Sequence, residues 1–136
     1  ALERSLSETK ERFTDFYARQ KTQFVWTIEH VFPQGVNIPS HWIDMVADGD
    51  REKANQVRKD WVHKLGNLTL TGYNPQLSNK SLLDKQNKKN KQGKAIGLQN
   101  GLALNAVVAE ATSWTQADIE RRTDFLVEKA LEIFKL

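Results

Sequence analysis

Apolar residues spaced three or four positions apart predict helices near both ends of the chain. Phe13, Phe16 and Tyr17 recur at this spacing within residues 5–20, which predicts an amphipathic helix. A second helix is expected over residues 115–134, which open on a Thr-Gln-Ala-Asp capping sequence. Its apolar stripe consists of Ile119, Leu126, Ala130 and Ile133.

Helical spacing also appears in the middle of the chain. A charged helix is predicted over residues 50–65, followed by Gly66 at the position where helices commonly end. One apolar side of this helix consists of Val57, Trp61 and Leu65. A short helical turn is expected at residues 41–46. A further helix starts either at Asn74-Pro75 or at Ser78. It carries Leu77, Leu82 and Leu83.

Short runs of β-forming residues predict strands in two places. Residues 24–28 (FVWTI) form the first run, and we expect this strand to end near Glu29 and His30. Residues 68–71 (LTLT) form the second run, which Gly72 ends. The pattern therefore predicts a mainly helical α+β domain with one small two-stranded sheet.

Composition places the chain among compact globular domains. A length of 136 residues, with 39% hydrophobic residues, suits one domain over residues 1–136 with a packed core. We expect Trp26, Trp61 and Trp114 to belong to that core. Without cysteine, the chain has neither a disulfide framework nor a Cys-ligated zinc site. Since no apolar run is long enough to cross a bilayer and no signal pattern opens the chain, a cytoplasmic location is expected.

Positive charge is concentrated in one stretch of the sequence. The net charge is +3, but residues 80–94 carry six lysines against one aspartate, about +5. These lysines are Lys80, Lys85, Lys88, Lys89, Lys91 and Lys94. Such a stretch is typical of a surface that binds a phosphate backbone. Lysine-rich helix faces that are merely solvated are equally common, so charge alone leaves both interpretations open.

Polar residues that suit phosphodiester hydrolysis cluster around the predicted strands. His30 has a side chain that accepts a proton from water near neutral pH. Glu29, Asn74 and Asn79 offer the oxygen ligands that Mg²⁺ prefers, and the amide of Asn67 can hold the base in place. Strand, strand and then helix is a compact unit that can bring these residues around one point.

Each of these residues also has a purely structural interpretation. A histidine at a strand end is more often structural than catalytic, and Glu29 can be an ordinary surface acid. Asn67 after a glycine is a common turn residue, and Asn74 a common helix cap. Neighbouring residues of a strand also point to opposite faces, so Glu29 and His30 share a site only if the strand ends or kinks there.

The clusters together resemble a known family. The motifs "TIEHVFPQ", "HKLGNLTLTGYNPQLSNKSLLDK", "GLALN", a single Trp and "IERRTDFLVEKALEIF" follow one another in this chain. They closely resemble the C-terminal HNH (His-Me finger) domain of GmrSD-type proteins, which are modification-dependent restriction enzymes and phage-defence proteins. The resemblance covers residues 27–134 and implies a ββα-metal core. In that family the domain usually follows a ParB-like nucleotide-hydrolysing domain, so we expect this chain to be the C-terminal part of a longer protein.

The resemblance also assigns roles to individual residues. It implies that His30 is the general base, that Glu29 is a ligand of Mg²⁺ or Mn²⁺, and that Asn67 braces the loop holding the base. A second ligand is expected on the helix, with Asn79 favoured over Asn74. It also implies a phosphate contact by Lys85, and the local positive charge predicts further contacts with DNA phosphates by Lys80, Lys88, Lys89 and Lys91.

The function expected from these features is metal-dependent cleavage of double-stranded DNA in restriction or anti-phage defence. A first alternative is a catalytically inactive HNH-like domain that binds nucleic acid without cutting it. A second alternative is a structural module that packs against a nucleotide-hydrolysing partner domain. Metal-dependent cleavage separates the nuclease from both alternatives, and salt-dependent retention on DNA separates the two alternatives from each other.

Overall fold

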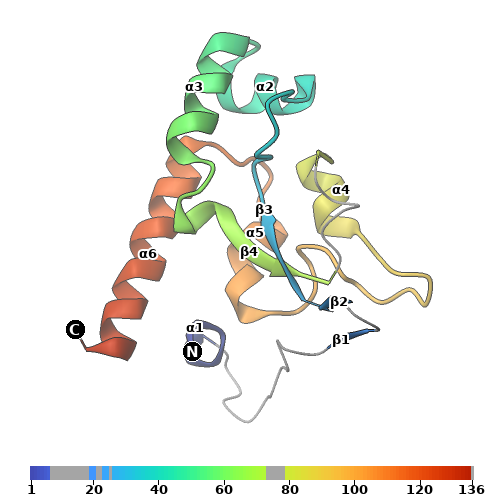
Figure 1. Cartoon of the computed structure of the whole chain (residues 1–136), viewed down its shortest axis with the longest axis vertical. Coiled ribbons are helices and arrows are strands. Elements are labelled where there is room, and N and C mark those ends of the chain that lie inside the picture. The colour runs from blue at the N-terminus through green and yellow to red at the C-terminus, as the bar shows by residue number, and fades with distance from the viewer. Residues whose placement is uncertain (7–18, 21–22, 25, 73–78, 136) are drawn as a thin grey trace.

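A computed structural model describes residues 1–6, 19–20, 23–24, 26–72 and 79–135 (Figure 1). The elements within these ranges, with η marking a 3₁₀ helix, are α1 (Leu2–Leu6), β1 (Arg19–Gln20), β2 (Gln23–Phe24), β3 (Thr27–His30), α2 (Ser40–Ala47), α3 (Arg51–Trp61), η1 (Leu65–Asn67), β4 (Leu68–Thr71), α4 (Leu82–Asn87), η2 (Ala103–Asn105), α5 (Ala106–Glu110) and α6 (Gln116–Phe134). The fold is mainly helical α+β, as predicted. The described residues form two antiparallel two-stranded sheets, β1–β2 and β3–β4, where the sequence predicted one.

The β3–β4 sheet lies at the centre of the molecule. Its register pairs Glu29 with Thr69 and His30 with Leu68, and Val31 N–H extends the pairing by donating to Asn67 O at 2.9 Å. The predicted strand over residues 24–28 is therefore placed too early, because β2 ends at Phe24 and β3 begins at Thr27. The predicted second strand at residues 68–71 is confirmed as β4.

Helix α6 runs along one side of this sheet, and α4 lies on the other (Figure 1). Gly66 allows α6 to approach closely, since a Cβ there would overlap the Ile119 carbonyl oxygen and lie 2.6 Å from Thr123 N. The buried Arg122 of α6 then donates to the carbonyl oxygens of Gly66 and Leu68, and also to that of Leu104. Burial lowers the pKa of Arg122 to about 10, which leaves the side chain charged at neutral pH. Helix α6 thus fixes the position of the turn that leads into β4.

The capping sequence predicted for the last helix is confirmed. Thr115 and Asp118 form a reciprocal capping box, and α6 ends at Phe134. Ile119 and Leu126 are buried, as expected for its apolar stripe. None of the helices in the described ranges is long and apolar enough to cross a membrane.

Helix α3 starts as predicted but ends earlier than residue 65. The Asp50 side chain accepts a hydrogen bond from Lys53 N at 3.1 Å and caps the helix. After Trp61 the chain turns into η1, with Lys64 N donating to Trp61 O. Leu65 consequently lies outside the helix and is 37% exposed, instead of joining the apolar side.

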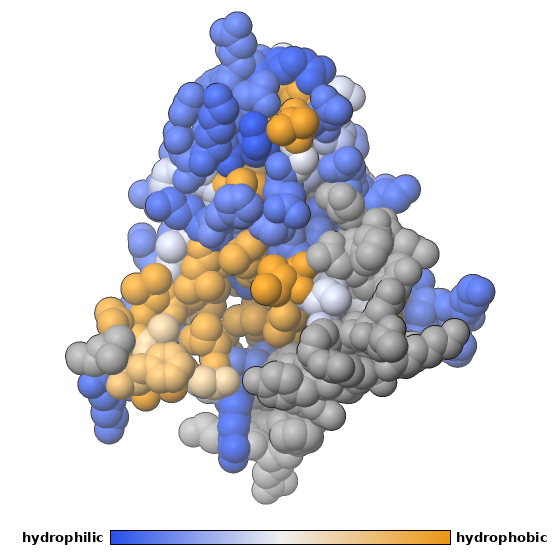
Figure 2. All heavy atoms as spheres, in the orientation of Figure 1, coloured by the Kyte–Doolittle hydropathy of each residue, from blue (hydrophilic) through white to orange (hydrophobic). Residues whose placement is uncertain are grey.

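The hydrophobic core contains an aromatic residue that was not among the predicted ones. Trp42 of α2 is fully buried, and its ring centroid lies 5.6 Å from that of Phe32. Trp114 is buried as predicted, while Trp26 and Trp61 are only half-buried. On the molecular surface, Figure 2 shows the face seen in Figure 1. The upper part of this face, which contains α2 and α3, is mostly hydrophilic, and apolar residues gather below it.

The remaining predicted helices fall partly on residues outside the described ranges. Residues 7–18 and 73–78 lie outside the described residues, so most of the first predicted helix and both predicted helix starts, Asn74 and Ser78, fall there. Strand β1 occupies Arg19–Gln20, where the first helix was expected to end. Helix α4 starts after Ser81, whose side chain accepts from Asp84 N at 3.1 Å, and it ends at Asn87. The lysine-rich stretch is therefore mostly loop and not a helix face.

Candidate active site

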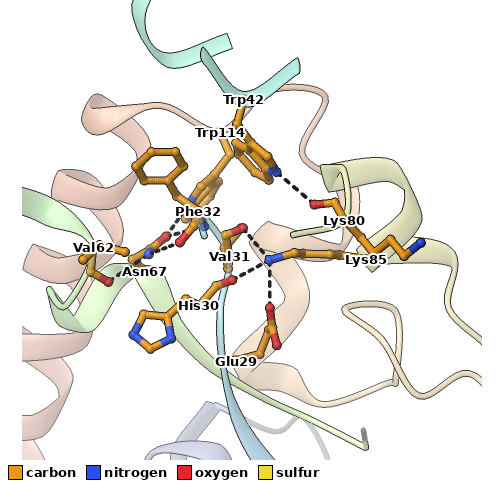
Figure 3. A network of polar contacts seen from close by, with 10 residues as sticks. All are labelled: Glu29, His30, Val31, Phe32, Trp42, Val62, Asn67, Lys80, Lys85 and Trp114. Atoms are coloured by element: carbon orange, nitrogen blue, oxygen red, sulfur yellow. Dashed lines mark hydrogen bonds and ion pairs between the residues drawn. The ribbon is translucent and has the colours of Figure 1, made fainter. Parts of the chain in front are cut away.

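Asn67 ties together the chain segments that surround the site. Its side chain is fully buried and accepts hydrogen bonds from Phe32 N at 2.8 Å and Trp114 Nε1 at 3.1 Å. The amide nitrogen donates to Phe32 O at 3.0 Å and to Val62 O at 2.9 Å (Figure 3). A primary amide has two donor hydrogens and two acceptor lone pairs, and all four are used here. Asn67 therefore holds the segment after β3, the end of α3 and the Trp114 ring in one arrangement.

His30 lies at the end of β3, half-buried, beside a second histidine. Its Nε2 is 3.1 Å from His63 Nδ1, and the two rings meet edge to face with centroids 5.2 Å apart. Burial is the main cause that lowers the pKa of His30, with smaller contributions from the charges of His63 and Lys85. A lowered pKa keeps the imidazole neutral at neutral pH, which is the state that can accept a proton.

Glu29 lies on the other face of β3, bound to a buried lysine. Figure 3 shows the Glu29 and His30 side chains leaving the strand in different directions. Glu29 is 1% exposed, and its Oε1 accepts from Lys85 Nζ at 2.8 Å. Its Oε2 is buried without a hydrogen-bond partner among the described residues. Burial raises the pKa of Glu29, and Lys85 lowers it in part.

Lys85 has an internal role that differs from the predicted contact with phosphate. Its side chain is fully buried, and the ammonium also donates to His30 O at 2.7 Å and Val31 O at 3.1 Å. The three donors of the ammonium are thus used by Glu29 and by two carbonyl groups of the strand end. Lys85 holds the backbone of the strand that carries His30, and it is not available to DNA.

The other predicted site residues lie apart from the buried ones. Asn79 is exposed in the segment before α4, and its Oδ1 would be 3.5 Å from a Cβ placed on Gly35. Lys80 is exposed, and its carbonyl oxygen accepts from Trp42 Nε1 at 2.9 Å. Asn74 lies outside the described residues.

The lysine-rich stretch after α4 forms a tight turn. Asn90 Oδ1 accepts from Gln92 N at 3.0 Å and from Lys94 N at 2.9 Å, and Gly93 has a φ of +79°. A bridge between Lys89 and Ala95 closes the turn. Lys89, Lys91 and Lys94 are exposed, and Lys88 is half-buried. We call Lys88, Lys89, Lys91 and Lys94 the basic turn.

Sequence reasoning assigned no role to His63, although its Nδ1 lies 3.1 Å from His30 Nε2. The sequence feature that could have indicated a role is the position of His63, four residues before Asn67. This spacing becomes informative only in the folded chain, where Asn67 Nδ2 donates to Val62 O and so holds the residue before His63 close to the strand end.

The predicted metal ligand Glu29 does not fit a divalent cation in this geometry. The Lys85 ammonium binds its Oε1 at 2.8 Å, and a second positive charge at the buried Oε2 would be repelled by that ammonium. The described part of the chain contains no cluster of three or more His, Cys, Asp or Glu side chains able to hold a metal ion.

Comparison with known families identifies the chain. Its sequence matches the family described as GmrSD restriction endonucleases, C-terminal domain, over residues 1–129. The chain therefore belongs to this family of restriction endonuclease domains. No curated protein and no solved structure matched the chain.

Replacing Asn67 by Ala is expected to destabilise the fold strongly. The change leaves the Phe32 amide and carbonyl groups, Val62 O and Trp114 Nε1 without their buried partner, which costs about 3 kcal/mol or more in the free energy of unfolding. Urea denaturation measures this loss. The exposed Asn37→Ala is the control, expected to lie within about 0.5 kcal/mol of the wild type. Equal stability of the two variants would contradict the role given to Asn67.

Proposed function

We propose that this chain hydrolyses phosphodiester bonds in double-stranded DNA, with His30 as the general base. The observation that carries the proposal is a half-buried imidazole at a strand end with a lowered pKa, in a chain of a restriction endonuclease family. One ring nitrogen of His30 faces His63, and the other has no hydrogen bond to the residues that the structure describes. A nitrogen in that condition is available to an incoming water molecule.

The chemical step moves one proton at His30. As the water oxygen attacks phosphorus, the free ring nitrogen of His30 takes the proton from that water, and the bond from phosphorus to the leaving oxygen breaks. A base positioned in this way contributes about 10²–10⁴ to the rate. The protein's part is to hold the backbone that carries the ring, which the buried contacts of Asn67 and Lys85 do on either side of the strand end.

The proposed reaction includes a divalent cation, Mg²⁺ or Mn²⁺, which would stabilise the negative charge that grows on the phosphate and the leaving oxygen. Mg²⁺ binds through one or two protein ligands together with substrate oxygens and waters. Among the described candidates, Asn79 has the exposed side chain that such a ligand needs, whereas Glu29 is enclosed. We therefore keep Asn79 as the protein ligand of the cation and leave out Glu29, which was expected beside it.

The basic turn is the proposed contact with the DNA backbone. Its exposed lysines are compact positive charges that bind phosphates without reading bases. Lys80 is exposed just before α4 and extends the same stretch of sequence. Target choice would then be made by other parts of a longer protein, such as the ParB-like domain that usually precedes this one in the family. Restriction of invading DNA is the biological role that this proposal implies.

A second candidate function is supported by the enclosure of Glu29. If the metal requirement cannot be met without this carboxylate, the domain binds DNA through its basic turn and does not cleave it. The two candidates differ in one observable, which is metal-dependent strand cleavage by the purified chain.

His30→Ala is expected to abolish plasmid cleavage by the chain in the presence of Mg²⁺ or Mn²⁺, lowering the rate by about 10²–10⁴. His41→Ala is the matched control, because His41 is an exposed histidine on α2. Conversion of supercoiled plasmid to nicked and linear forms, with an EDTA arm, measures the rate. Retained cleavage by His30→Ala would remove His30 from the role of base, and absence of cleavage by the wild type in every arm would favour the non-cleaving function.

Replacing Lys88, Lys89 and Lys91 together by Ala is expected to weaken DNA binding and to flatten its salt dependence. The slope of log K against log salt becomes shallower by about 0.9 for each phosphate that the protein no longer neutralises. The charge-matched control replaces Lys53, Lys59 and Lys64, which are exposed at α3 and just after it. Fluorescence anisotropy over a salt series measures both quantities. An equal loss in the two triple variants would show that the basic turn is not the binding surface.

A further inference from the structure

We propose that His63 is a positioning residue for His30: its Nδ1 accepts a hydrogen bond from His30 Nε2–H and so leaves His30 Nδ1 as the nitrogen that meets water. This inference rests on the proposed function, in which His30 is the base. Its first support is the 3.1 Å distance between the two nitrogens, in the usual range for a hydrogen bond. The 77° angle between the rings makes this an edge contact, not a stack.

The choice of donor follows from what a base needs. A neutral imidazole has one N–H and one lone pair, on opposite sides of the ring. If His63 were the donor, the lone pair of His30 would be used by His63, and His30 Nδ1 would carry the hydrogen. His30 would then have no lone pair for water. Only the arrangement in which His30 donates and His63 accepts leaves a basic nitrogen at the site.

The backbone around the two histidines is built to keep this distance. Asn67 Nδ2 binds Val62 O, directly before His63, and both Asn67 amide atoms bind the backbone of Phe32, two residues after His30. Lys85 holds the His30 carbonyl group from the other side of the strand. Neither Asn67 nor Lys85 touches the imidazole of His30 through a hydrogen bond. Among the described residues, His63 is the partner of that ring.

A purely structural role explains His63 poorly. Its side chain is exposed, so its replacement opens no cavity and leaves no buried group unpaired except at His30. His63 also sits just beyond α3 in a turn whose backbone is fixed by Lys64 N donating to Trp61 O. Substitution at this position is therefore expected to change the orientation and protonation of His30 while the fold stays intact.

The test compares His63→Leu with His63→Asn, two variants of similar size. Asn keeps an acceptor oxygen near the position of the His63 Nδ1 atom, and Leu has none. In plasmid cleavage the Leu variant is expected to lose about 10–100-fold in kcat with an unchanged KM, the loss that is typical when the partner orienting a metal-binding histidine is removed. The Asn variant is expected to recover most of this loss. A Leu variant as active as the wild type, or equal losses in Leu and Asn, overturns the inference.

A second readout does not depend on cleavage. Long-range ¹H–¹⁵N NMR of the ¹⁵N-labelled chain identifies which nitrogen of His30 carries the hydrogen. The expected result is the Nε2–H form in the wild type and in His63→Asn, and a mixture of both forms in His63→Leu. An Nδ1–H form in the wild type overturns the inference even if the chain cleaves DNA. If the chain cleaves nothing and the expected NMR pattern is found, the proposed function fails while the positioning by His63 stands.

Discussion

The four hydrogen bonds of Asn67 are the constraint on which the rest of the site depends. They join the segment after β3, the end of α3 and the Trp114 ring through one buried amide. Four polar groups that would be costly to leave unpaired in the core are satisfied together, so their arrangement is strongly preferred over any alternative. Gly66, directly before Asn67, lets α6 approach closely enough for Arg122 to bind the backbone of the same turn. His30, the proposed base, and its neighbour His63 are positioned as a consequence of this packing.

Strand β3 separates two chemical environments. On one face Glu29 and Lys85 form a buried ion pair, which is costly to desolvate and is held by further bonds to the strand carbonyl groups. On the other face His30 is half-buried, with a pKa that burial lowers, and lies next to His63. The pair Glu29–His30, adjacent in sequence, is thus divided between structural support and proposed chemistry. The ordinary alternation of a strand produces this division.

Local patterns were sufficient to predict the last helix with its capping sequence, the strand at residues 68–71 and the start of α3, because capping residues and β-forming runs act over a few residues. The family was also recognised from its motifs. The early end of α3 was not predictable from spacing, since it depends on a bond between Asn67 and Val62 O that forms only in the folded chain. The burial of Lys85 was missed for a similar reason. A lysine in a basic stretch is normally solvated, and only the facing carboxylate of Glu29 and the carbonyl groups of His30 and Val31 make its burial possible.

The pH dependence of DNA cleavage tests the central claim, that the fold presents His30 as a neutral base, most directly. Burial and the neighbouring charges lower the pKa of His30 below its ordinary value of 6.5, so its neutral form persists into mildly acidic solution. The account predicts that kcat/KM of the wild-type chain rises with pH and levels off at a midpoint below 6.5, because the free protein needs His30 unprotonated. A midpoint clearly above that value, or no cleavage at any pH with Mg²⁺ or Mn²⁺ present, would contradict it.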